Sequence, residues 1–172
     1  MAATGTVAQM STLATHTALS VWSVANDFLI AIILFVVLFL FAWYVGHGSF
    51  VGLLLAFYAG YAIYALFPYV SLLPTTPALT AFLAHVGLYA VFVFIFYIIL
   101  RRVIASDFLT IGKLGLVALS LLGAAFLIAV AAHIFSVSSF YQFTPAIAAF
   151  FPSKYFFWWF SGPAIGLLFF AW

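Results

Sequence analysis

The chain contains no cysteine and very few charged residues. Among its 172 residues are four Lys or Arg and two Asp or Glu, so that only 3% of the chain is charged. Soluble domains carry about a quarter charged residues, and so few charges cannot keep a water-facing surface solvated. The missing cysteines exclude disulfides, thiolate nucleophiles, Cys-ligated zinc and iron–sulfur clusters. The scarcity of cations also excludes nucleic acid as a partner, because binding to phosphates needs clustered basic residues.

Apolar residues make up 70% of the sequence, and the mean hydropathy is +1.40. A helix that crosses the roughly 30 Å hydrocarbon core of a bilayer needs about 20 apolar residues. Five segments meet this requirement: 28–45, 49–67, 79–100, 112–135 and 155–172. The sequence therefore predicts an all-α, polytopic membrane helix bundle with about five transmembrane helices, and the lipid bilayer as its surroundings.

The fifth segment contains Ser161-Gly162-Pro163 at its middle. Proline removes one backbone donor and clashes with the preceding helical turn. We therefore expect either a kinked span or a re-entrant half-helix at this position.

Residues 1–26 differ from the remainder of the chain. Apolar residues recur there at three- and four-residue steps, with Ser, Thr, Gln and His between them. This periodicity predicts an amphipathic or interfacial N-terminal helix, followed by the transmembrane bundle of residues 27–172. The short turn Gly46-His47-Gly48 predicts that the first two spans are antiparallel neighbours.

The orientation in the membrane follows from the positions of the cations, since Lys and Arg near span ends are retained in the cytoplasm. Arg101, Arg102 and Lys113 flank the connection between the third and fourth spans. They place that connection inside, the N-terminus outside and the C-terminus in the cytoplasm. Lys154 falls on the outer side in this scheme.

Small residues at helical spacing predict where the helices pack. In lipid, helices associate through close backbone approach and a few polar contacts instead of hydrophobic burial. The predicted packing positions are Gly48, Gly52, Ala56, Gly60, Ser120, Ala124, Gly162 and Gly166. These seams either hold the monomer together or form the contact of a homo-oligomer.

Two histidines fall within the predicted spans, His85 on the third and His133 near the end of the fourth. An ionisable group at membrane depth is a candidate for function. Neutral histidines bonded to neighbouring hydroxyls or carbonyls explain both residues without a cofactor. Proton or ion handling and bis-histidine haem ligation are the alternatives. A polar path would also use Ser120 and the tyrosines of the second span, Tyr58, Tyr61 and Tyr64.

No catalytic or metal-binding motif stands in the sequence. It contains no GxSxG, HExxH or phosphate-binding loop, and its two acids, Asp27 and Asp107, are far apart in the chain. Paired acid–base chemistry has no paired carboxylates to use. We therefore predict that the protein is not an enzyme and that it holds no metal.

The order of several landmarks resembles a known family. An acid opens the first span (Asp27), a glycine turn follows (Gly46 to Gly48), and an inner loop has an acid before spaced glycines (Asp107, Gly112 and Gly115). This order, over about residues 27–135, resembles the colicin V production protein family of small bacterial inner-membrane proteins. The whole chain, and its end FFWWFSGPAIGLLFFAW most of all, is similar to uncharacterised multi-span membrane proteins of candidate-phylum bacteria. Neither resemblance implies catalytic residues.

Three functions remain open from the sequence. The first is a non-enzymatic structural or assembly subunit that packs with copies of itself or with another membrane protein. The second is a small transporter or channel component with a polar path through His85 and His133. The third is a membrane anchor subunit that binds haem or quinone.

Overall fold

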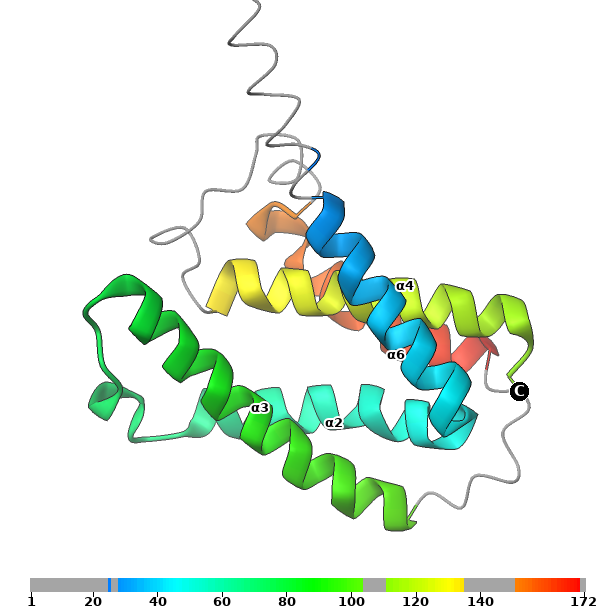
Figure 1. Cartoon of the computed structure of the whole chain (residues 1–172), viewed down its shortest axis with the longest axis horizontal. Coiled ribbons are helices and arrows are strands. Elements are labelled where there is room, and N and C mark those ends of the chain that lie inside the picture. Colours follow the sequence, from blue (N-terminus) through cyan, green and yellow to red (C-terminus); the bar gives the residue numbers. More distant parts are fainter. Residues whose placement is uncertain (1–24, 26–27, 104–110, 135–150, 171–172) are drawn as a thin grey trace, which may run out of the picture.

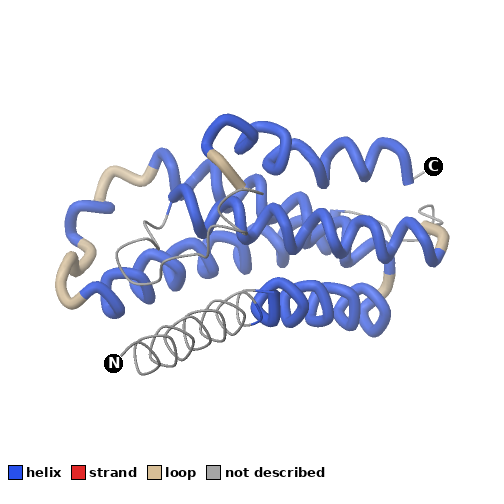
Figure 2. The backbone as a smooth tube through the Cα atoms, turned by 90° about the horizontal axis from the view of Figure 1, so that it is seen from above, coloured by secondary structure: helices blue, strands red, loops and turns tan. Residues whose placement is uncertain are grey.

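A computed structural model describes residues 25, 28–103, 111–134 and 151–170. The regular elements in these ranges are helical, which confirms the predicted all-α class. In chain order they are the first helix Phe28–Val45, α2 His47–Leu66, the short η1 Val70–Leu72, α3 Ala78–Val103, α4 Lys113–Ile134, the short η4 Ser153–Tyr155 and α6 Phe156–Phe170. Figure 2 shows a short turn between the first helix and α2, and a longer connection through η1 between α2 and α3. The predicted N-terminal segment 1–26, apart from Ala25, lies outside the described residues, as do Asp27 and Asp107.

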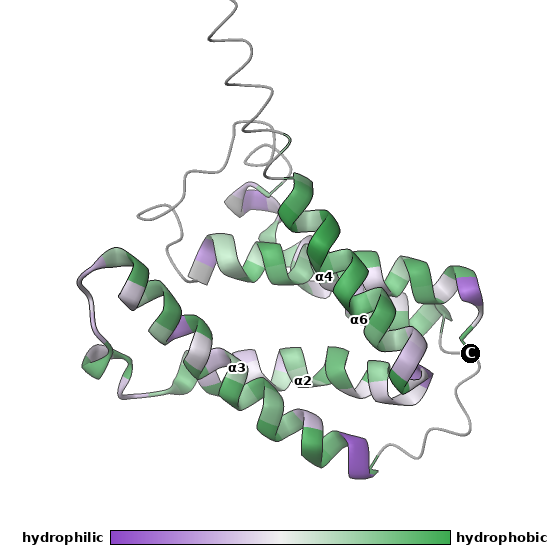
Figure 3. Ribbon diagram, viewed as in Figure 1, coloured by the Kyte–Doolittle hydropathy of each residue, from purple (hydrophilic) through white to green (hydrophobic). Residues whose placement is uncertain are grey.

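Four of the helices are long and apolar enough to cross a membrane: the first helix, α2, α3 and α4. Their ends fall within three residues of the predicted span limits. The fifth helix, α6, has 15 residues and contains Pro163. At about 1.5 Å per residue it is roughly 22 Å long, which is less than the thickness of the hydrocarbon core. Figure 3 shows apolar residues along most of each helix, with the strongest polar colour at helix ends.

Helices α2 and α3 form one packed pair, and they cross as Figure 1 shows. Gly60 of α2 faces Val93 of α3. A Cβ atom added at Gly60 would lie 2.7 Å from the Val93 Cγ2 and 3.0 Å from the Val93 backbone nitrogen. The two backbones approach this closely only because Gly60 has no side chain.

Helices α4 and α6 form the second packed pair. A Cβ atom at Gly166 of α6 would lie 2.8 Å from a methyl carbon of Leu122 and 3.0 Å from one of Leu119. Gly162, one turn earlier, lies against Leu122 in the same way, at 3.3 Å. The leucines of α4 therefore pack into the surface left open by the two glycines of α6.

Figure 1 shows the first helix running obliquely across α4 and α6 and leading into the start of α2. It turns back at Gly46, whose φ of 97° is a left-handed conformation that glycine adopts readily. Leu38 is buried beside Gly123 of α4, and the Phe41 ring lies 5.8 Å from the ring of Tyr97 on α3. The first helix thus contacts more than the helix that follows it. Leu54 of α2 borders the same point of Gly123 as Leu38, so the first two spans are neighbours as predicted, but they meet obliquely and do not run antiparallel (Figure 1).

The most deeply placed helix is α4, with 56% of its span residues buried, followed by α2 with 44%. The first helix and α3 are peripheral, with 11% buried in each. Large apolar side chains cover the exposed faces of both peripheral helices. Apolar side chains on the outer faces are what a protein surrounded by hydrocarbon requires, so this distribution fits a helix bundle in a membrane.

Candidate functional site

An aromatic cluster occupies the space between α2, α4 and α6. The ring of Phe126 on α4 lies 4.9 Å from Tyr58 and 6.1 Å from Phe57, both on α2. The ring of Phe160 on α6 lies 5.0 to 5.1 Å from the rings of Tyr58, Tyr61 and Phe126. Edge and tilted contacts of this kind add to the packing energy of each ring pair. The cluster connects the α2–α3 pair to the α4–α6 pair.

The hydroxyl of Tyr58 forms hydrogen bonds with backbone atoms of α6 beside Pro163. It donates a hydrogen bond to the carbonyl of Phe160 and accepts one from the backbone N–H of Ala164, at 3.2 Å. In a regular helix the N–H of residue 164 would donate directly to the carbonyl of residue 160. The hydroxyl therefore bridges the donor and the acceptor of one backbone hydrogen-bond pair of the helix, next to the pair whose donor Pro163 lacks.

Hydrogen bonds between α2 and α3 form the second part of the site. The Tyr64 hydroxyl and the His85 Nδ1 are joined at 2.8 Å, and the two rings are 6.3 Å apart. The Tyr89 hydroxyl donates to the carbonyl of Phe57 at 3.1 Å, and the ring of Tyr89 packs edge-on against that of Tyr64. These contacts pair α2 with α3 on the His85 side of the crossing at Gly60.

His133 lies near the C-terminal end of α4 against α6. Its ring is 4.8 Å from that of Phe156, and its buried Nε2 has no hydrogen-bond partner in the structure. Among the described residues, no hydrogen bond or ring contact joins His133 to His85: His85 bonds to Tyr64, and the His133 ring lies against Phe156. The described ranges also hold no group of three or more His, Cys, Asp or Glu side chains placed for a metal.

The predicted packing residues lie at the following places. Four of them are buried on α2: Gly48, Gly52, Ala56 and Gly60. On α4, Ser120 is fully buried and its hydroxyl donates to the carbonyl of Leu116, 2.8 Å away in the same helix. Ala124 is also buried on α4, whereas Gly162 and Gly166 face α4 from α6.

The predicted topology residues gather at one end of the bundle. Arg101 and Arg102 lie in the last turn of α3, and Lys113 is the first residue of α4. Figure 1 shows these two helix ends on the same side of the molecule. All three side chains are exposed.

Sequence reasoning missed the contacts of Tyr58 and Tyr89 with backbone atoms of other helices. Pro163 was a signal that one hydrogen bond of the fifth helix is lost, and three tyrosines on the second span were a signal for buried hydroxyls. Nothing in the spacing indicates which tyrosine meets which helix. The match depends on helix crossing angles, which distant residues determine.

The arrangement is suited to holding helices together. The hydroxyls of Tyr58, Tyr89 and Ser120 bond to main-chain atoms, and the Tyr64 hydroxyl bonds to His85.

In comparisons with known proteins, no family model, no curated protein and no solved structure matches this chain.

Proposed function

We propose that the protein is a non-enzymatic structural or assembly subunit of the bacterial inner membrane. In this role it associates with copies of itself or with another membrane protein. The observation that supports the proposal most is the uncovered face of α3 around Gly87.

Helix α3 packs against the rest of the chain on one face, where Phe82, Val86 and Phe92 are among its partly buried residues. Its buried residues are Tyr89 and Val93. Gly87 is exposed, and no atom lies within 4 Å of the place where its Cβ would be. Gly60 and Gly166, in contrast, each lie against a neighbouring helix.

A glycine inside a helix costs about 1 kcal/mol relative to alanine. At Gly60 and Gly166 close packing offsets this cost, but no contact among the described residues offsets it at Gly87. Small residues are where a second membrane helix approaches most closely. The face of α3 at Gly87 is therefore the place at which a partner helix would pack.

The internal hydrogen bonds agree with this role. Tyr58 of α2 bonds to a backbone atom of α6, and Tyr89 of α3 bonds to a backbone atom of α2. These bonds lie between helices of the same chain and do not use the exposed face of α3. The shared end of Arg101, Arg102 and Lys113 supports an orientation with the N-terminus outside and the C-terminus in the cytoplasm.

The test is self-association in liposomes, measured by energy transfer between donor- and acceptor-labelled protein over a range of protein-to-lipid ratios. Gly87→Leu should weaken association by about tenfold, because the added side chain separates the backbones by more than a contact tolerates. Val37→Leu is the control, since Val37 is 57% exposed and lies on the first helix instead of α3. If the wild type associates with neither itself nor a co-purifying membrane protein, the proposal is wrong. If the two variants weaken association equally, α3 is not the surface.

A second candidate is a small transporter or channel component, and the buried, unpartnered Nε2 of His133 favours it. This function predicts pH-dependent flux in proteoliposomes that is lost in both His85→Ala and His133→Ala. Absence of flux in the wild type would exclude it. The third hypothesis, a haem or quinone anchor, predicts a Soret band or extractable quinone in the purified protein.

A further inference from the structure

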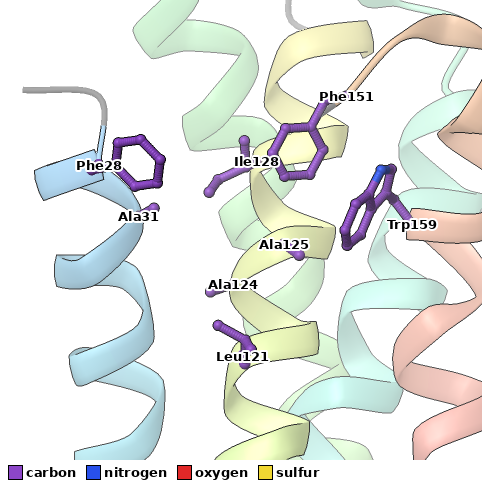
Figure 4. Close-up of a pocket in the computed structure, with 8 residues that line it drawn as sticks. All are labelled: Phe28, Ala31, Leu121, Ala124, Ala125, Ile128, Phe151 and Trp159. Atoms are coloured by element: carbon purple, nitrogen blue, oxygen red, sulfur yellow. The ribbon is translucent and has the colours of Figure 1, made fainter. Parts of the chain in front are cut away.

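A cavity opens between the first helix, α4 and the start of α6. Its volume is about 240 Å³. Figure 4 shows its walls: Ala31 on the first helix; Ala124, Ala125 and Ile128 on α4; and Phe151 and Trp159 at the third side. The three alanines leave the space, since larger side chains at these positions would fill it.

The lining is almost entirely apolar carbon. The rings of Phe151 and Trp159 lie 4.9 Å apart and close the third side of the cavity. An apolar cavity of about 150 Å³ already accommodates a benzene molecule and stays dry without one. Because this cavity lies on helices that are inserted in a membrane, hydrocarbon is the material available to enter it.

A cation follows one wall of the cavity closely in the sequence. Lys154 lies in η4, after Phe151 and before Trp159 in the chain, the two residues whose rings close the third side. Lys154 is exposed, and its Nζ is 5.7 Å from the centre of the Tyr155 ring. The first turn of α6, which follows directly, has no acidic residue. A Lys beside aromatic rings at the end of an apolar helix is typical of the headgroup region, where it attracts anionic lipids.

We propose that this part of the molecule is a binding site for one anionic phospholipid. The phosphate lies against the Lys154 ammonium, and part of one acyl chain occupies the cavity between the first helix, α4 and Trp159. The charge of Lys154 selects the headgroup, and the apolar walls hold the chain. None of the lining residues belongs to α3, and the site does not depend on the proposed assembly function.

The experiment is native mass spectrometry of the purified full chain, titrated with phosphatidylglycerol or with phosphatidylcholine of the same acyl chains. The wild type should bind the first phosphatidylglycerol about fivefold more tightly than phosphatidylcholine, the effect of one Lys near an anionic headgroup. Lys154→Gln should remove this preference. Lys113→Gln, which neutralises the chain's other lysine at the first residue of α4, should leave it unchanged.

Filling the cavity tests the acyl-chain part separately. Ala125→Leu and Ala31→Leu reduce the cavity from two different helices, and both should weaken the binding of both lipids. Circular dichroism verifies that each variant keeps its helical content. Equal binding of the two lipids by the wild type, an unchanged preference in Lys154→Gln, or unchanged binding in both filled variants would overturn the proposal. Displacement of the lipid by inorganic phosphate would also overturn it, because the site would then recognise the free anion.

Discussion

Removing the hydroxyl of Tyr58 tests whether α6 is held at its break by α2. Tyr58→Phe keeps the ring and its contacts with Phe126 and Phe160 but deletes two hydrogen bonds, one to the Phe160 carbonyl and one from the Ala164 N–H. Hydrogen bonds between membrane helices contribute about 0.6 kcal/mol each, so the free energy of unfolding should fall by about 1.2 kcal/mol. The loss stays this small because the freed N–H and carbonyl stand four residues apart and can bond to each other.

The assay is reversible unfolding in mixed detergent and SDS micelles, followed by circular dichroism. Tyr61→Phe is the matched control: its ring contacts Phe160 at 5.0 Å, one turn further along α2, but no hydrogen bond of its hydroxyl is found among the described residues. Tyr61→Phe should change the free energy of unfolding by less than about 0.5 kcal/mol. Equal losses in the two variants would refute the bridging role of the Tyr58 hydroxyl.

Three further predictions use the same unfolding assay. Gly60→Ala should destabilise the protein by about 1 to 3 kcal/mol, because the new Cβ would lie 2.7 Å from Val93. Gly87→Ala, whose Cβ would meet nothing within 4 Å, should be neutral or stabilise the protein by up to about 1 kcal/mol. Equal effects of the two variants would show that α2 and α3 do not meet at Gly60. Tyr64→Phe should cost about 0.6 kcal/mol through the lost bond to His85, and a neutral result would speak against that bond. Ser120→Ala should change the free energy of unfolding by less than about 0.5 kcal/mol, because among the described residues the hydroxyl bonds to Leu116 in its own helix alone; a larger loss would indicate a partner on another helix.

The helices could be predicted from the sequence because each span is a local property of the chain. An apolar run has to satisfy its own backbone as a helix, and prolines or glycines mark its ends. The first helix therefore ends at the predicted residue, Val45, and α4 differs from its prediction by one residue at each end. The fifth helix is the exception in length, since it ends at Phe170 within the described residues and begins after η4.

The partners of the helices could not be predicted in the same way. Small residues showed where a neighbour could approach, but the pairing of Gly60 with Val93 and of Gly166 with Leu122 depends on the three-dimensional crossing of helices. The oblique path of the first helix was missed for the same reason, because a short turn limits distance and leaves direction open. The contact of Tyr58 with Ala164 joins residues 106 positions apart, beyond any local pattern.

Labelling of single cysteines in cells tests the central claim most directly, namely that this chain crosses the membrane with its Arg101, Arg102 and Lys113 end in the cytoplasm. The natural sequence has no cysteine, so each label reports one position. Ser71→Cys in η1 and Val103→Cys at the end of α3 are both exposed sites at the two ends of α3. A membrane-impermeant maleimide should label Ser71→Cys in intact spheroplasts and Val103→Cys only after lysis. Labelling of both positions in intact spheroplasts, or release of the protein from membranes by alkaline carbonate, would contradict the account.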